Sequence, residues 1–96
     1  MDVGSDDEAD ELLRVLAHPA RRQILRECWH RSVSAGALVD TLGLAAASVS
    51  EHLRVLRKSG LVVLTRSGTF RLYRTDTALM RALIRWLAEF PHDGQS

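Results

Sequence analysis

The chain has 96 residues, of which 46% are hydrophobic, and it carries a formal net charge of +1. This length suits one domain with a modest core and leaves little room for a second domain. The charge is unevenly spread, because residues 1–11 contain six acids and no base, so that residues 12–96 carry a net charge of +7. A basic body of this kind suits a polyanionic partner.

Three further features bear on where the protein works. The longest apolar runs are too short to span a membrane. The acidic N-terminus contradicts a signal peptide, which begins with basic residues followed by an apolar stretch. Cys28 is the only cysteine, so the chain cannot form an intramolecular disulfide. Together these features predict a cytoplasmic protein without a membrane segment.

The N-terminal third predicts a flexible acidic leader over residues 1–5 and then two helices. Ser5 is placed to cap the first helix, whose apolar face runs from Leu12 to Leu16. The pair His18-Pro19 ends this helix, and Pro19 suits the first position of the next one. The second helix is expected over residues 19–30, with Cys28 buried as a small hydrophobic residue.

The central stretch predicts two short helices, over residues 35–42 and 45–59, joined by a tight turn. Apolar residues recur at helical spacing through both segments. Gly43 lies between them, where a helix-turn-helix needs a residue that accepts positive φ. Gly60 is a natural stop for the second of the two helices.

The C-terminal third predicts a β-hairpin followed by a last helix. Residues 61–65 and 69–75 are the expected strands around the turn signal Ser67-Gly68, with Phe70, Leu72 and Tyr73 on the apolar side. Asp76 or Thr75 is expected to cap a helix that continues to about Phe90, with a flexible tail over residues 91–96. The whole pattern predicts one mainly helical domain over residues 6–90, a winged helix-turn-helix with the order α-α-α-α-β-β-α.

The helix over residues 45–59 has the features of an element that reads the DNA major groove. Short polar groups and basic residues lie on its non-core surface, and a basic hairpin tip follows in the sequence. Its first turn, Ala45 to Ala47, lacks a capping oxygen and polar side chains, which predicts sparse base readout and more weight on DNA backbone and shape. The residues that we expect to contact double-stranded DNA are Ser48, Ser50, Glu51, His52, Arg54, Arg57, Arg66, Thr69 and Arg71. A solvated helix face and an ordinary charged turn are the alternative interpretations of the same residues.

Two stretches of the sequence resemble the ArsR/SmtB family of bacterial transcriptional repressors: LAHPARRQIL over residues 16–25 and SVSEHLRVLRKSGLV over residues 48–62. The resemblance covers about residues 8–90. It implies a homodimer built on the first and last helices, a palindromic operator, and repression relieved by a ligand or metal. The last helix carries more apolar surface than so small a domain needs for its own core. The residues expected at the dimer interface are Leu12, Leu13, Leu16, Met80, Leu83, Ile84 and Leu87.

The family's best-known metal sites are missing from this sequence. Ser34 and Gly36 stand where one family site has a Cys-x-Cys pair, and Asp76 is followed by Ala78 where another has Asp-x-His. The remaining ligand types, Cys28 with His30 and Glu89 with His92 and Asp93, make weak sites. We therefore expect no metal and no cofactor.

The function predicted from the sequence is that of a homodimeric, sequence-specific repressor on an inverted-repeat operator. No nucleophile, phosphate-binding loop or metal cluster supports an enzyme. Two alternatives stay open: a winged-helix module for protein–protein contact, and a metal- or redox-responsive repressor with an atypical site. The existence of a small-molecule inducer also stays open.

Overall fold

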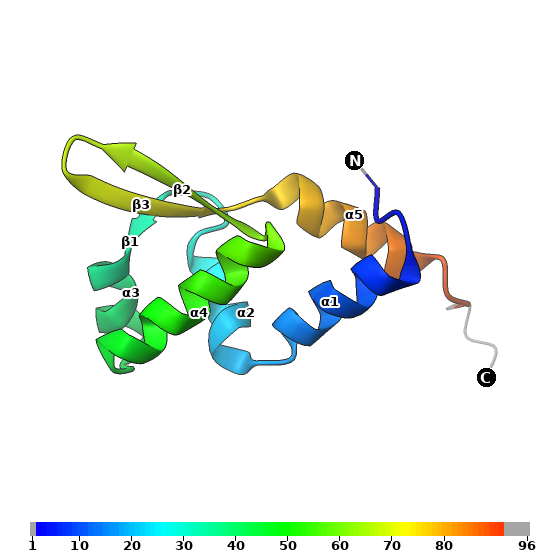
Figure 1. Cartoon of the computed structure of the whole chain (residues 1–96), viewed down its shortest axis with the longest axis horizontal. Coiled ribbons are helices and arrows are strands. Elements are labelled where there is room, and N and C mark those ends of the chain that lie inside the picture. Colours follow the sequence, from blue (N-terminus) through cyan, green and yellow to red (C-terminus); the bar gives the residue numbers. More distant parts are fainter. Residues whose placement is uncertain (1, 92–96) are drawn as a thin grey trace.

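A computed structural model describes residues 2–91 and contains five helices and a three-stranded sheet in that part of the chain (Figure 1). The expected tail lies outside the described residues apart from Pro91. The elements are α1 (Asp6–Leu16), α2 (Pro19–Glu27), β1 (Val33–Ser34), α3 (Ala35–Leu42), α4 (Ala46–Ser59), β2 (Val62–Ser67), β3 (Phe70–Thr75) and α5 (Thr77–Ala88). The predicted winged helix-turn-helix is confirmed, with one extra short strand.

The start of α1 is fixed by local hydrogen bonds. The Ser5 hydroxyl accepts from the backbone N–H of Glu8 at 3.2 Å, as its capping position predicts. The Glu8 carboxylate in turn accepts from the backbone N–H of Gly4, the residue before the cap, at 2.9 Å. Val3 packs against the hydrophobic core, so the residues just before α1 contact the helical body.

Helix α2 begins at Pro19, as predicted, but ends at Glu27 rather than near residue 30. The reason lies in β3, where Thr75 satisfies two carbonyls at the end of the helix. Its hydroxyl donates to the Leu25 carbonyl at 2.8 Å, and its backbone N–H donates to the Cys28 carbonyl at 3.0 Å. These bonds replace helical ones and join α2 to the hairpin.

The core lies where α1, α2, α3 and α4 meet the sheet. Its fully buried side chains are all apolar, and they include Ile24, Leu38, Val49, Leu56, Leu61 and Leu83. Tyr73 and Thr75 project from β3 into the same core and are 8% and 3% exposed. Because α4 shares this core and contacts α1, α2, α3 and β2, packing fixes its orientation.

The helix-turn-helix is formed by α3 and α4. Gly43 ends α3 with φ of +67°, a left-handed conformation that costs glycine little and other residues more. Gly60 ends α4 with φ of +87°, and its N–H donates to the carbonyls of Arg57 and Leu56. Both helix ends therefore fall where the glycines predicted them.

The sheet has the strand order β1-β3-β2, and both pairings are antiparallel. Strand β1 was missed in the sequence because two residues are too few to show an alternating pattern. Strands β2 and β3 form a hairpin with Val62 opposite Thr75 at its base and Ser67 opposite Phe70 at its tip. This hairpin projects from the body beside α3 and α4 (Figure 1).

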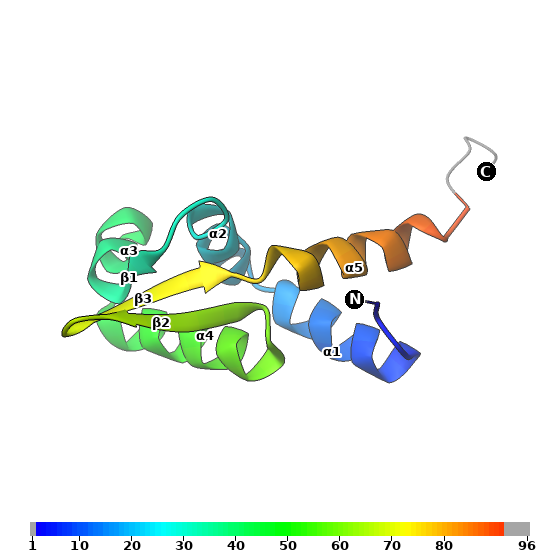
Figure 2. The same cartoon turned by 90° about the horizontal axis from the view of Figure 1, so that it is seen from above.

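Helix α5 lies beside α1 at the end of the molecule opposite the hairpin tip (Figures 1 and 2). Asp76 caps it, since its carboxylate accepts from the backbone N–H of Leu79 at 3.0 Å. Only Ala82 and Leu83 of this helix are buried. Leu79, Met80 and Trp86 are partly buried against the core, whereas Ile84 and Leu87 are exposed, so part of the apolar surface of α5 is left uncovered in a single chain.

Candidate nucleic-acid interface

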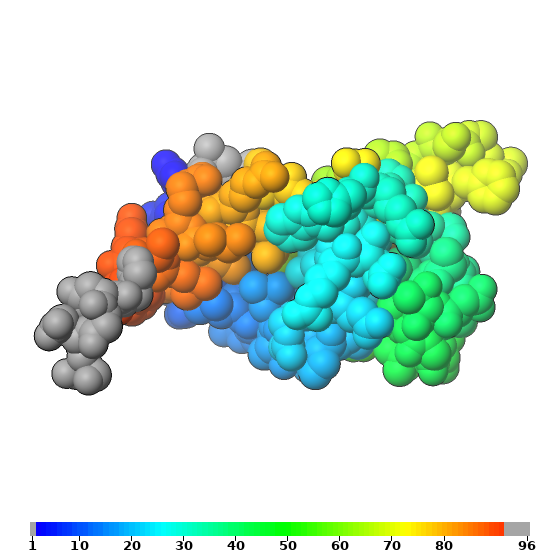
Figure 3. Space-filling view, turned by 180° about the vertical axis from the view of Figure 1, so that it is seen from behind, coloured from blue at the N-terminus to red at the C-terminus, as the bar shows by residue number. Residues whose placement is uncertain are grey.

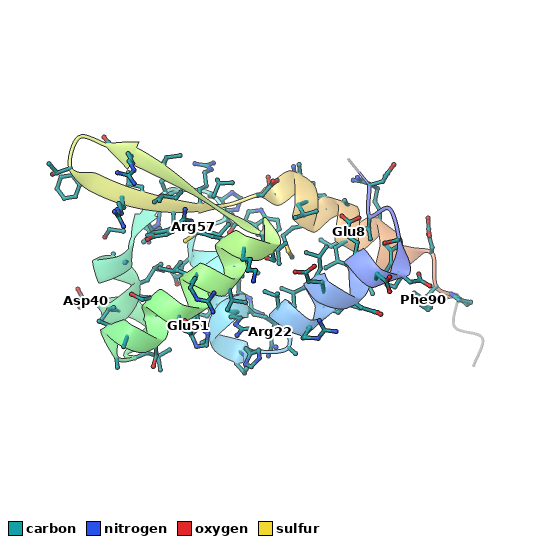
Figure 4. All side chains as sticks on the ribbon, viewed as in Figure 1. Glu8, Arg22, Asp40, Glu51, Arg57 and Phe90 are labelled. Atoms are coloured by element: carbon teal, nitrogen blue, oxygen red, sulfur yellow. The ribbon has the colours of Figure 1, made fainter. Side chains whose placement is uncertain are left out.

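Helix α4 presents a polar face to solvent and an apolar face to the core. Val49, Leu53 and Leu56 are buried, as their spacing predicts. Five of the six expected DNA contacts on this helix have exposed side chains: Ser48, Ser50, Glu51, Arg54 and Arg57. Figure 4 shows Arg57 on the part of α4 beneath the hairpin and Glu51 nearer the start of the helix.

Glu51 and Arg54 form a two-point ion pair on the exposed face of α4. The Arg54 Nη2 lies 2.6 Å from Oε1 of Glu51, and Nε lies 3.0 Å from Oε2. Through this hydrogen bond Arg54 lowers the pKa of the Glu51 carboxyl below its usual value. Arg54 is thus held by an acid of the same helix, and a phosphate must compete with that acid for its guanidinium.

His52 is the expected contact that turns away from the exposed face. Its ring is half-buried against α2, where Nδ1 accepts from Nε of Arg21 at 3.3 Å. The ring of His18 lies 6.3 Å away, measured between centroids. Burial, Arg21 and His18 all lower the pKa of His52, while Glu51 raises it. The neutral ring therefore helps to position α4 on α2, and only its far edge is left to face a ligand.

The first turn of α4 lacks a side-chain cap. Ala45 occupies the capping position without a side-chain hydrogen bond, and Ala46 and Ala47 are exposed. Methyl groups offer no hydrogen bonds to base edges and contact only the thymine methyl. The geometry therefore leaves Ser48 and Ser50 as the polar groups nearest the start of the helix.

The hairpin tip gathers basic and apolar side chains. Arg66 of β2 lies directly opposite Arg71 of β3, which places two guanidinium groups on the same face of the hairpin. Thr69 follows Gly68 in the turn, and all four residues are exposed. Phe70, expected on the apolar side, is 67% exposed. Tyr73, also expected on the apolar side, is buried together with Thr75. Alternate residues of a strand share a face, so Phe70 and Leu72 lie on the other face of the hairpin.

An open groove of about 740 Å³ runs between α4 and β2. Its polar lining is entirely basic: Arg54, Arg57, Lys58 and Arg66. Lys58 was not among the expected contacts, although it stands four residues after Arg54 and so shares its helix face. The groove brings the predicted recognition helix and the predicted wing into one basic surface.

The positions that hold metals in the resembled family serve local structure here. The Ser34 hydroxyl caps α3 by accepting from the backbone N–H of Ala37 at 3.2 Å, and Asp76 caps α5. Cys28 is buried, and burial, with a smaller contribution from Glu27, raises the pKa of its thiol to about 11. Within residues 2–91, no three ligand-type side chains gather into a metal-binding group. His92 and Asp93 lie outside the described residues.

The expected dimer residues divide into two groups. Leu12 and Leu83 are 3% and 1% exposed in the single chain, so they belong to its own core and offer no surface to a partner. Their helical spacing marks an apolar face but does not say what covers it. The other five expected residues are accessible: Leu13, Leu16 and Met80 are half-buried, and Ile84 and Leu87 are exposed.

The fold and this surface define a winged helix-turn-helix of the DNA-binding kind, and comparison with known proteins gives the family. Residues 16–65 match the family described as a helix-turn-helix domain. The chain is 38% identical over 74 residues to the transcriptional regulator KmtR of Mycobacterium tuberculosis, covering 77% of this chain and 57% of KmtR. It is 41% identical over 68 residues to the repressor SmtB of the same organism, covering 71% of this chain and 50% of SmtB.

A solved structure, the ArsR-like transcriptional regulator from Rhodococcus sp. RHA1, superposes with a TM-score of 0.81 at 28% identity. The match covers 90% of this chain and 81% of that one. The chain therefore belongs to the ArsR/SmtB family of winged helix-turn-helix transcription regulators, which bind DNA. It spans about half the length of the two curated relatives named above. None of the helices within residues 2–91 has the length and apolar character to cross a membrane.

Proposed function

We propose that the protein is a homodimeric repressor that binds an inverted-repeat operator with α4 in the major groove and the hairpin tip at the neighbouring minor groove. The observation that carries the proposal is the groove between α4 and β2, whose polar lining residues are all basic. When a recognition helix enters the major groove and a wing reaches the next minor groove, the DNA backbone between them passes through such a groove. Arg57, Lys58 and Arg66 are the proposed phosphate contacts.

Sequence readout is assigned to Ser48 and Ser50, with Glu51 accepting from a cytosine amine. The alanines of the first turn make these base contacts few. Specificity then depends in larger part on the wing, where Arg66, Thr69 and Arg71 favour a narrow minor groove. The expected operator is accordingly a short half-site beside an A·T-rich segment.

The dimer is assigned to α5 and the neighbouring side of α1. Ile84, Leu87 and Phe90 are 51%, 42% and 56% exposed, and they lie on the part of the molecule farthest from the hairpin tip (Figure 2). An apolar surface of this kind on a helix is typical of an interface between subunits. A twofold axis there would present two copies of α4 to successive turns of DNA.

Regulation is proposed to bypass the family's metal sites. Ser34 and Asp76, at two of those positions, already cap α3 and α5 through their side-chain oxygens. The Cys28 thiol stays protonated at neutral pH because burial raises its pKa to about 11. The proposed repressor therefore needs a signal other than a metal bound at those positions.

The experiment is a selection of bound duplexes from a random-sequence DNA pool, followed by mobility-shift titration of the selected sequence. The proposal predicts an inverted repeat with half-site centres roughly 10 base pairs apart or a multiple of that spacing. It also predicts a complex with one protein dimer. Sequence-independent binding, or no binding, would reject the operator and leave protein–protein contact as the role of the domain.

A further inference from the structure

A small groove lies on the face of the molecule opposite the view of Figure 1, where α2 meets the end of α1 and the start of α5 (Figure 3). It has a volume of about 220 Å³. Its floor is apolar and comes from three segments of the chain: Leu16, Leu25, Trp29 and Met80. Among the described residues, its polar lining consists of Arg22 and Arg26.

The two arginines stand four residues apart, so they lie on the same side of α2. The Arg22 Nη1 donates to the Leu16 carbonyl at 2.8 Å, which fixes one guanidinium at the end of α1. Figure 4 labels Arg22 near the start of α2. Within residues 2–91, no carboxylate pairs with Arg22 or Arg26. Like charges at this spacing repel each other, and an anion placed between them would relieve the repulsion.

From this geometry we infer that the groove binds a small hydrophobic monocarboxylate, with its carboxylate on Arg22 and Arg26 and its apolar chain along Trp29 and Met80. Guanidinium groups bind planar carboxylates through two parallel hydrogen bonds, which an alcohol of the same chain length cannot form. The apolar floor disfavours a polyphosphate or a nucleic acid. The inference does not rest on the proposed operator binding, because the groove uses none of the residues assigned to DNA. Leu16 and Met80 of its floor are also among the residues expected at the dimer interface, so the inference requires a dimer that leaves the groove open.

Trp29 provides the reporter for the test. The chain has two tryptophans, so Trp86→Phe leaves Trp29 as the only indole. The probe is octanoate, titrated below its micelle concentration against the full-length protein, with octanol as the uncharged match. Isothermal titration calorimetry on the unmodified chain gives a second measurement that does not depend on the Trp86 substitution.

The inference predicts saturable binding of octanoate and at least about tenfold weaker binding of octanol. Arg26→Gln and Arg22→Gln should each weaken octanoate binding about tenfold. Arg74→Gln makes the same charge change on the exposed part of β3 and should leave binding unchanged.

Three results would overturn the inference. The first is the absence of saturable octanoate binding. The second is octanol binding as tight as that of octanoate, or an equal loss of octanoate binding in Arg26→Gln and Arg74→Gln. Either result would show that the two arginines of the groove do not recognise the carboxylate. The third is binding that appears only in an Ile84→Glu monomer, because it would mean that a second copy of the chain covers the groove.

Discussion

At the scale of single residues, we propose that the pair of Glu51 and Arg54 controls how α4 contacts DNA. The acid lies on the same exposed face as the basic groove and holds Arg54 with two hydrogen bonds of 2.6 and 3.0 Å. A carboxylate at this place repels phosphate wherever it does not find a hydrogen-bond donor on a base. We therefore expect Glu51 to reduce binding to the wrong sequences and to lower the overall DNA affinity.

Glu51→Gln should raise affinity for random-sequence DNA several-fold by releasing Arg54 to a phosphate. The slope of log Kd against log salt should steepen by about 0.9 for each protomer. Fluorescence anisotropy at several salt concentrations measures both quantities. Asp40→Asn removes the same charge from an exposed acid of α3 and should leave the slope unchanged. Matching changes in slope for the two variants would contradict this role of the Glu51–Arg54 pair.

His52 makes the stability of the fold depend on pH. Its pKa in the folded protein lies below the ordinary value of 6.5, because of burial, Arg21 and His18. Between the two pKa values, the unfolded chain therefore binds a proton that the folded chain does not. The free energy of unfolding falls as the pH drops below the pKa of the unfolded chain and towards the lower pKa of the folded chain. The stabilisation by the neutral ring is fully present only above pH 6.5.

Urea unfolding between pH 8 and pH 5 tests this expectation. The free energy of unfolding should fall more steeply in the unmodified protein than in His52→Gln, whose side chain keeps an acceptor for Arg21. His30→Gln, which changes an exposed histidine, should follow the unmodified curve. A His52→Gln curve parallel to that of the unmodified protein would show that this ring does not carry the pH dependence.

At the scale of elements, Thr75 joins the hairpin to α2. Thr75 is 3% exposed. Its hydroxyl donates to the Leu25 carbonyl, which has no helical N–H partner because α2 ends at Glu27. Thr75→Val keeps the shape and removes the hydrogen bond, so it should lower the free energy of unfolding by about 1–2 kcal/mol.

The matched control is Thr65→Val. The exposed Thr65 hydroxyl donates to the Leu72 carbonyl at 3.4 Å, and its loss should lower the free energy of unfolding by less than about 0.5 kcal/mol. Equal costs in chemical denaturation would contradict the capping role.

The helices could be predicted from the sequence because their signals are local. Ser5, Pro19, Gly43, Gly60 and Asp76 mark helix ends by the chemistry of their own side chains or backbone. The end of α2 and the strand β1 could not be predicted in this way. Both depend on hydrogen bonds to β3, which lies some forty or more residues further along the chain.

The candidate site was predicted less completely than the fold. Ser48, Arg57 and Arg66 are exposed as expected, because the apolar spacing of α4 and the turn at Gly68 place them. Periodicity does not tell which neighbour lies against a polar side chain, so the contact of His52 with Arg21 was missed. The same limit applies to Leu12 and Leu83, whose apolar face is covered by the chain itself.

At the scale of the whole molecule, the proposed DNA surface and the proposed dimer surface lie at opposite ends. The hairpin tip and α4 lie at one end, and the exposed apolar residues of α5 at the other (Figure 1). In a dimer joined through α5, the spacing between the two recognition helices depends on the packing at this interface. A change in that packing would alter DNA affinity without touching a DNA-binding residue.

Ile84→Glu should produce a monomer at micromolar concentration, since a charge would be buried at the interface. Operator affinity should fall by about 100-fold or more, because the second half-site is no longer bound by a linked subunit. Sedimentation equilibrium measures the oligomeric state. Val63→Glu places the same charge at another exposed apolar residue, on β2, and should leave the dimer intact. A dimeric Ile84→Glu protein would contradict the assignment of the interface to α5.

We propose that α4 and the hairpin together hold the DNA backbone in the basic groove. The most direct test is the salt dependence of operator binding, measured by anisotropy for the unmodified protein and for Arg57→Gln, Arg66→Gln and the control Arg81→Gln on α5. Each of the first two substitutions should reduce the slope of log Kd against log salt by about 2 per dimer, while the control should leave it unchanged. Slopes that stay the same in Arg57→Gln and Arg66→Gln would show that the DNA backbone does not pass through this groove.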